Sequence, residues 1–137
     1  MQEIFADTDV CLDLLTGRQP HNAAAERLFT FADKGNLRIH VSSLTFSHID
    51  YILQSQYKRR DSRMILARFK TLVNVLAVDE KVIDLALASD VKDFEDAIQY
   101  NTAIQNNVQV LLTRNVKDYK KANIAVSTPE VFVIGVV

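Results

Sequence analysis

The sequence has few of the residues that interrupt or cross-link a chain. It contains three glycines and two prolines in 137 residues, so little of it suits a flexible linker. Its single cysteine, Cys11, cannot form an intramolecular disulfide, and its apolar surroundings favour a buried thiol over a reactive one. These absences exclude a disulfide-stapled chain, and the length favours one domain over residues 1–137.

Long apolar runs and a strong net charge are missing too. No stretch approaches the roughly 20 apolar residues of a membrane span. The first residues carry no basic segment of the kind that opens a secretion signal. We therefore expect a cytoplasmic protein with no membrane partner. The formal net charge of −1 gives no general attraction for nucleic acid, so any such binding must come from a local patch.

One segment is strongly basic. Residues 58–70 contain six basic residues and one acid, and the first four basic residues are Lys58, Arg59, Arg60 and Arg63. The segment has two interpretations, a solvated helix face or an arm that binds RNA phosphates. The sequence leaves both open, and these four residues are the candidates for RNA binding.

Short apolar segments alternate along the chain with helical patterns. The predicted strands are residues 4–6, 37–41, 75–78, 108–112 and 124–126. Helical spacing of apolar residues occurs within 10–15, 24–32, 46–53, 65–73, 82–87 and 97–104, and a last helix starts near 128–130. Short apolar strands separated by helices favour a mainly parallel sheet covered on both faces, which is a three-layer α/β/α fold.

Polar residues follow several of the predicted strands. The carboxyl ends of parallel strands share one edge of the sheet, where ligand sites form. Asp7, Ser42-Ser43 and Thr113–Asn115 occupy such positions, so we expect them to meet in space. With the acids near helix starts, the candidate carboxylates are Asp7, Asp9, Asp93, Glu95, Asp96 and Asp118. Carboxylates of this kind bind Mg²⁺, and a bound divalent cation promotes phosphodiester hydrolysis.

Each acid also has a structural explanation. Asp is a favoured helix N-cap, and we assign that role to Asp93 and prefer it for Asp9. Asp96 follows Asp93 by one helical turn, so it either completes a capping box or binds metal, and both interpretations stay open. Asp7 is harder to explain in this way, because an uncompensated carboxylate at the end of a buried strand is costly.

Three segments resemble the PIN domain family, which includes the VapC-type toxins of toxin–antitoxin pairs. They are Ile-Phe-Ala-Asp-Thr-Asp-Val-Cys-Leu-Asp-Leu-Leu (4–15), Asp-Phe-Glu-Asp-Ala-Ile-Gln-Tyr (93–100) and Leu-Leu-Thr-Arg-Asn-Val-Lys-Asp-Tyr (111–119). Together they cover essentially the whole chain. The resemblance implies a PIN-like fold and a ribonuclease that depends on Mg²⁺ or Mn²⁺ held by three or four acids.

The resemblance also implies roles for individual residues. Asp7 matches the first acid of the family and Asp96 the third. Asn115 stands where family members often have Asp, and Asp118 then supplies the fourth carboxylate. The implied catalytic residues are therefore Asp7, Asp96, Asp118, Asn115 and Thr113, with the three aspartates as metal ligands.

One position departs from the family pattern. Within residues 42–53 the family usually has Glu where this sequence has His48. Imidazole is a poor ligand for Mg²⁺, so either the metal preference is shifted towards Mn²⁺ or Zn²⁺, or one ligand has been lost. We prefer His48 as a residue that lines the cleft without binding metal. Asp9, Ser43 and Glu95 are expected in the same cleft.

Two functions follow from this pattern. The first is a metal-dependent ribonuclease, which the resemblance implies to be the toxin of a pair with an antitoxin protein as partner and a homodimer as its assembly. The second is a catalytically degraded PIN-fold module that binds RNA or a partner protein without turnover, as His48 and Asn115 favour. A third interpretation, a phosphoacceptor receiver domain centred on Asp79, leaves residues 93–119 unexplained.

Overall fold

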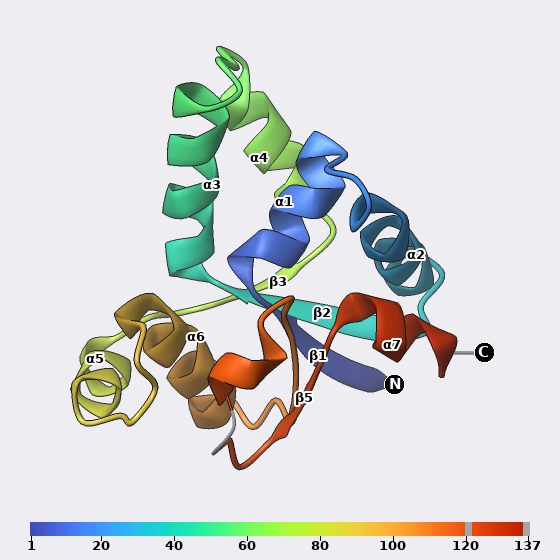
Figure 1. Cartoon of the computed structure of the whole chain (residues 1–137). Helices are drawn as coiled ribbons and strands as arrows, with labels where there is room; N and C mark the ends of the chain where they lie inside the picture. The colour runs from blue at the N-terminus through green and yellow to red at the C-terminus, as the bar shows by residue number, and fades with distance from the viewer. Residues whose placement is uncertain (120–121, 136–137) are drawn as a thin grey trace.

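The computed structural model describes residues 1–119 and 122–135, in which strands and helices alternate (Figure 1). The strands are β1 (Gln2–Ala6), β2 (Leu37–Ser42), β3 (Asn74–Leu76), β4 (Val110–Leu112) and β5 (Ala125–Ser127). The helices are α1 (Thr8–Thr16), α2 (Asn22–Asp33), α3 (Ser43–Ser55), α4 (Ser62–Lys70), α5 (Glu80–Leu87), α6 (Phe94–Gln105), the 3₁₀ helix η1 (Val116–Tyr119) and α7 (Pro129–Ile134). Within these described residues, no helix combines the length and the apolar character that crossing a membrane requires.

The strands form one parallel sheet in the order β3-β2-β1-β4-β5. The chain builds outward from β1 to β3 on one side and then returns to add β4 and β5 on the other. The direction of building thus reverses between β1 and β4. In open α/β sheets, ligands bind outside the carboxyl ends of the strands at such a switch point. The predicted fold, α/β with a mainly parallel central sheet, is confirmed.

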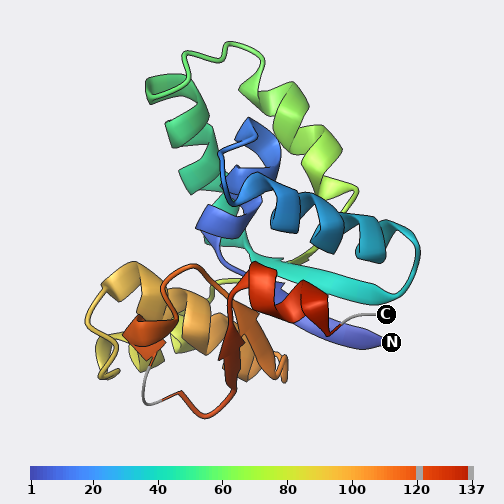
Figure 2. The same ribbon diagram turned by 45° about the vertical axis from the view of Figure 1, so that its right-hand side comes forward.

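Helices cover both faces of the sheet (Figures 1 and 2). The helices α1, α2, α3, α4 and α7 lie on one side of it, and α5 and α6 lie on the other. Along β1, Ile4 and Ala6 point into the cluster on the first side, whereas Phe5 points towards α6. All three side chains are completely buried. The central strand is therefore apolar on both faces, which explains its unbroken apolar sequence.

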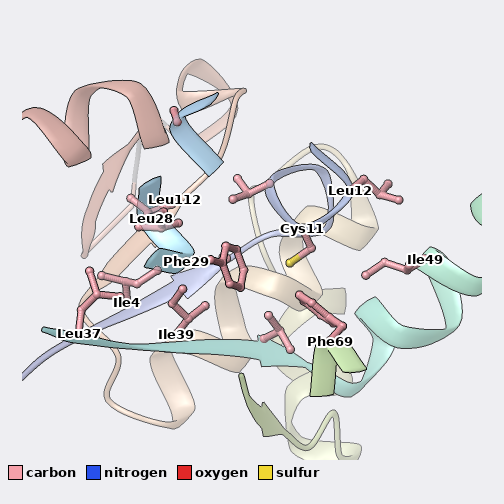
Figure 3. Close-up of a cluster of buried hydrophobic side chains, with 14 of the residues drawn as sticks. Ile4, Cys11, Leu12, Leu28, Phe29, Leu37, Ile39, Ile49, Phe69 and Leu112 are labelled. Atoms are coloured by element: carbon pink, nitrogen blue, oxygen red, sulfur yellow. The ribbon is translucent and has the colours of Figure 1, made fainter. Parts of the chain in front are cut away.

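The larger hydrophobic cluster joins the sheet to the helices of the first side (Figure 3). Cys11 is buried in this cluster, as predicted, and burial raises the pKa of its thiol, so the thiol stays protonated and unreactive. Phe69 of α4 is 1% exposed, and its ring centroid lies 5.9 Å from that of Phe29 and 5.7 Å from that of Phe46. Phe69 therefore anchors α4, which carries much of the basic segment.

Two strands are shorter than predicted. The strand expected over 108–112 begins at Val110, because α6 ends with Asn107 in the left-handed region (φ 57°) and the Val108 N–H donates to the Ala103 carbonyl over 3.0 Å. The strand expected over 75–78 runs from Asn74 to Leu76. The end of α6 and the strand β4 thus compete for the same apolar residues, and Val108 belongs to the end of the helix.

The helix starts correct one prediction and confirm another. The prediction of Asp9 as the cap of α1 was wrong. Asp7 is the N-cap, and its Oδ1 accepts from the N–H groups of Asp9 (3.1 Å) and Val10 (3.4 Å). Asp93 caps α6 as predicted, with its Oδ1 accepting from the Asp96 N–H over 2.9 Å. The carboxylate that ends the central strand therefore also starts the first helix.

We predict that Phe69→Ala lowers the free energy of unfolding by about 3 to 5 kcal/mol, because it removes a buried ring from between two others. Met64→Ala on the same helix is the control, since Met64 is 57% exposed, and it should change stability by less than about 0.5 kcal/mol. Urea titrations followed by circular dichroism measure both. Equal losses in the two variants would contradict the role of Phe69 as the anchor.

Candidate functional site

Asp7 fixes the centre of the candidate site at the switch point of the sheet. It directly follows β1, and its backbone N–H donates to the Leu112 carbonyl at the end of β4 over 3.1 Å. The side chain is almost completely buried, at 6% exposure for the residue. Its Oδ1 is occupied by the two N–H groups at the start of α1. One face of the carboxylate is thus committed to the fold.

The segment after β4 contributes Thr113 and Asn115. The Thr113 N–H donates to the Ser127 carbonyl over 3.0 Å, which holds this segment against β5. The Thr113 hydroxyl oxygen accepts from the Asn115 N–H over 3.1 Å, and the hydroxyl lies beside Asp7, where it lowers the pKa of the carboxyl group. Thr113 therefore links the turn to Asp7, as its sequence position suggested.

Asp96 reaches the same place from α6. It lies in the first turn of that helix, which Asp93 caps, and it is half-buried. Tyr119 of η1 is buried beside it, with its hydroxyl facing the Asp96 carboxyl group. Asp96 donates its own N–H to the cap, and its side chain faces the site, so the helix start and the site use different atoms of one residue.

The electrostatics of the site are those of crowded, poorly solvated carboxylates. Burial raises the pKa of Asp7 to about 7, opposed by the Thr113 hydroxyl and reinforced by nearby acids that include Asp96. The pKa of Asp96 is raised to about 6, chiefly by burial and also by the charges of Asp93 and Asp118. Both groups therefore hold protons at pH values where ordinary aspartates are ionised.

The remaining acids are placed less centrally. Asp9 is 43% exposed at its side chain and is bound by Arg18, whose Nη2 lies 3.3 Å from Asp9 Oδ1. Asp118 and Asn115 are exposed, and Asp118 acts on Asp96 through its charge. Within residues 1–119 and 122–135, no three carboxylate, imidazole or thiol side chains converge into a ready cation site. A cation here would rely on two carboxylates and on water.

His48 and Glu95 pair with each other. His48 of α3 contacts the Glu95 carboxylate through Nδ1, so an acid from α6 faces the position where an acid was expected on α3. Their side chains are 35% and 40% exposed. Ser43 has a structural contact instead, because its hydroxyl accepts from the Val78 N–H over 3.2 Å. The structure thus brings two of the four expected cleft residues into contact with each other and ties Ser43 to the segment after β3.

A buried polar cluster behind the acids was missed by the sequence analysis. Gln99 donates from Nε2 to the hydroxyl oxygens of Thr8 (3.1 Å) and Thr45 (2.9 Å), and the two hydroxyls lie 3.1 Å apart. All three residues are buried. The cluster joins α1, α3 and α6. Thr8 follows Asp7 directly, and Gln99 lies one helical turn after Asp96. The available signal was the spacing of Gln99, which shares a helix face with Asp96.

A buried ion-pair cluster was missed as well. Asp13 of α1 has a side chain only 2% exposed, and Arg114 binds it in a bidentate manner, with Nε 3.0 Å from Oδ2 and Nη2 2.6 Å from Oδ1. Arg18 adds a contact to Oδ1 at 3.1 Å. Because Arg114 stands between Thr113 and Asn115, this cluster fastens the site segment to α1. The signal was an acid within the apolar stretch of the first helix.

The basic segment lies away from the acids. It begins in the connection between α3 and α4, at the end of α3 remote from Ser43 (Figure 1). A helix of 13 residues is about 20 Å long. Arg59 is held by Asp61, with contacts of 2.9 Å and 2.8 Å. The four basic candidates therefore do not join the acidic site, and any role in RNA binding would be at a distance from it.

Comparisons with known proteins agree with the observed α/β fold. The family model for the PIN domain matches residues 3–117. A comparison with curated proteins gave no match. Among solved structures, the chain resembles a toxin–antitoxin complex from Klebsiella pneumoniae, with 22% identity and a TM-score of 0.68 over 92% of this chain and 97% of that chain.

Two further solved structures are similar. VapC20 of Mycobacterium tuberculosis, a sarcin-ricin loop cleaving toxin, has 21% identity and a TM-score of 0.64 over 79% of this chain and 86% of that chain. VapBC2 of Rickettsia felis, bound to a DNA fragment from its promoter, has 16% identity and a TM-score of 0.69 over 92% of this chain and 97% of that chain. Likeness at this identity establishes the fold, and the family match spans most of the sequence; the chain belongs to the PIN domain family.

Proposed function

We propose that the chain is a ribonuclease that depends on Mg²⁺ or Mn²⁺, with Asp7 and Asp96 as metal ligands. The observation that carries the proposal is the meeting of these two carboxylates at the switch point of the sheet, where burial raises the pKa of both. Such a pair is electrostatically unfavourable without a counter-charge. Membership of the PIN domain family supports the same assignment.

The donor set fits a hard divalent cation. Mg²⁺ usually binds through one or two carboxylates and keeps several waters, and this site offers two carboxylates with neutral oxygen donors beside them. When bound, the cation supplies positive charge for the phosphoryl oxygens and makes an attacking water more acidic. Asp118 is our candidate for a third carboxylate, and Asn115 and Thr113 are candidates for holding water or phosphate.

Hydrogen bonds and an ion pair within the protein hold the candidate metal ligands in place. The N–H groups of α1 and the Thr113 hydroxyl fix the Asp7 carboxylate. The Asp13–Arg114 pair fixes the segment that carries Thr113 and Asn115. Rigid support of this kind keeps reacting groups in place and removes the need to reorganise them during the reaction.

The proposal extends to the biological setting. We propose that the substrate is RNA, that the chain is the toxin of a toxin–antitoxin pair, that it forms a homodimer and that it acts in the cytoplasm. Support comes from the solved structures that resemble it, two of which come from such pairs and one of which is a toxin that cleaves the sarcin-ricin loop.

A second candidate function is a PIN-fold module that binds RNA or a protein without turnover. The contact between His48 and Glu95 favours it, since a histidine stands where the family usually has an acid and occupies the carboxylate of an acid nearby. Calorimetric titration separates the two candidates. A folded protein that takes up neither Mg²⁺ nor Mn²⁺ at millimolar concentration would favour the module.

For the ribonuclease, we predict that purified protein cleaves a mixed single-stranded RNA pool with Mg²⁺ or Mn²⁺ and not with EDTA. Asp7→Asn and Asp96→Asn should each lower the rate by about 100-fold or more, because loss of a direct ligand should cost at least as much as loss of its supports. Asp84→Asn, an exposed acid on α5, is the control and should cleave like the wild type.

Two outcomes would contradict this prediction. Cleavage that persists in both variants would remove these aspartates from the site. No cleavage with either metal, by a protein shown to be folded and free of a bound inhibitor, would favour the binding module.

We also predict a pH-dependent gain of stability in Asp7→Asn without metal. The folded pKa of Asp7, about 7 against 3.8 for the free group, means that the wild type loses stability as pH rises between these values. Asn removes this titration and remains a good N-cap. The stability difference between variant and wild type should therefore shift in favour of the variant by about 2 to 3 kcal/mol between pH 5 and pH 8.

Urea titrations in EDTA at the two pH values measure this shift. Saturating Mn²⁺ at pH 8 should stabilise the wild type and leave the variant nearly unchanged, because the cation replaces the missing proton. A difference between variant and wild type that is equal at both pH values would show that Asp7 is not the titrating group.

For the basic segment, we predict an effect that depends on RNA length. Arg60→Glu with Arg63→Glu should weaken binding of RNA long enough to follow α3 for about 20 Å and should lower the slope of log K against log salt by about 1 to 2. Dinucleotide binding should not change. Lys34→Glu, at the end of α2, is the control. An unchanged salt slope for long RNA would exclude these residues from the RNA path.

A further inference from the structure

A large cavity opens beside the acidic site, and Asp118 and Tyr119 belong to its lining. Its volume is about 700 Å³, and it lies between the connection from α5 to α6, the helix α6 itself and η1. In Figures 1 and 2, α6 and the 3₁₀ helix that carries residues 116–119 lie side by side. Small-ligand cavities commonly measure about 300 to 1,000 Å³, so this one can hold a nucleotide.

The cavity and the acidic site share a wall. Tyr119 lines the cavity, and its hydroxyl faces Asp96 in the acidic site. Asp118 also lines the cavity, and its charge acts on Asp96. The cavity and Asp96 therefore have Tyr119 and Asp118 as common neighbours. A polymer with one phosphate at the acidic site would have its neighbouring nucleoside within reach of the cavity.

The lining suits a base more than a bare anion. Tyr100 offers a half-buried ring, 6.3 Å from that of Tyr119, and its hydroxyl oxygen is held by the Asn123 N–H over 2.9 Å. Asn101 donates from Nδ2 to the Ala97 carbonyl over 2.8 Å, which leaves its Oδ1 as an acceptor for a ligand. Aromatic rings and amide groups are the usual partners of single-stranded RNA bases.

The charges around the cavity nearly balance. Lys92 and Lys117 line it, and neither is paired with a carboxylate among the described residues. Three acids line it too, Asp90, Asp93 and Asp118. Free inorganic phosphate is therefore poorly matched, whereas a neutral base whose phosphate is shared with the acidic site fits both the ring and the lysines.

We propose that this cavity binds the nucleoside next to the scissile phosphate and determines which base the enzyme prefers there. The proposal rests on the proposed ribonuclease function, because that function puts the phosphate at Asp7 and Asp96. Tyr100 stacks on the base, the Asn101 Oδ1 accepts from its edge, and Lys117 lies beside the sugar-phosphate chain. These are specificity-determining residues and take no part in the proton transfers.

Binding of mononucleotides tests the cavity without cleavage. The probes are the 5′-monophosphates of adenosine, guanosine, cytidine and uridine, titrated into metal-free protein in EDTA and followed by two-dimensional ¹⁵N NMR. We expect one base to bind several-fold more tightly than the others and to shift the signals of Tyr100, Asn101 and Lys117. Shifts confined to other parts of the chain would overturn the proposal.

Two variants with matched controls sharpen the test. Tyr100→Ala should weaken the preferred mononucleotide about 10-fold, as loss of a stacking ring does, while Tyr100→Phe keeps the ring and should bind within about 2-fold of the wild type. Lys117→Gln changes an exposed side chain and keeps the proposal testable if Tyr100→Ala does not fold. Its control is Lys81→Gln, an exposed lysine outside the cavity. Wild-type affinity in Lys117→Gln and in folded Tyr100→Ala would overturn the proposal.

Product sequencing from a randomised RNA pool separates this proposal from the function it rests on. If the wild type cleaves with a base preference next to the cut, Tyr100→Ala should flatten that preference and slow cleavage of the preferred sequences, and the remaining cleavage should still require metal. An unchanged preference in that variant overturns the cavity proposal and leaves the ribonuclease intact. If the wild type cleaves nothing, the ribonuclease falls, and the mononucleotide titrations alone decide whether the cavity binds a base.

Discussion

The burial of the Asp7 carboxylate at the end of the central strand is the constraint on which the site depends. A carboxylate in this position must be compensated, and the fold supplies two N–H donors from α1 and one hydroxyl from Thr113. These donors do not suffice, because burial still raises the pKa of Asp7 to about 7. Binding of a positive charge, either a proton or a metal cation, therefore stabilises the site.

The sheet order explains why the compensating groups come from distant parts of the sequence. Since β1 and β4 are neighbours, the residue after β1 and the residue after β4 lie at one edge, so Asp7 meets Thr113. Arg114 then reaches Asp13 and locks the segment after β4 against α1. Removing one partner of a buried ion pair is strongly destabilising. The Asp13–Arg114 pair therefore resists local opening at the site.

The sequence predicted that Asp7 and Thr113, which follow strands, lie together, and it missed the contacts that cross between helices. Ser43, expected beside them, accepts from the Val78 N–H instead. Asp7 and Thr113 were predictable, because a strand end in a parallel sheet has one possible location. The contact of Asp13 with Arg114 was not predictable, because a helical pattern alone does not tell a buried acid from a solvated one. The strand assigned to Val108 was too long for a related reason, since a helix ending and a strand start use similar apolar residues.

The two candidate functions, ribonuclease and binding module, predict different links between protonation and cation binding. With a pKa of about 7 for Asp7 and about 6 for Asp96, a cation must displace protons from both groups below neutral pH. Metal affinity should therefore rise steeply with pH until both carboxylates are free of protons. A degraded site would lack this dependence, because it would hold no cation at any pH. The dependence of metal uptake on pH therefore reports on the burial of Asp7. It also distinguishes a site that binds metal weakly from a site that binds none.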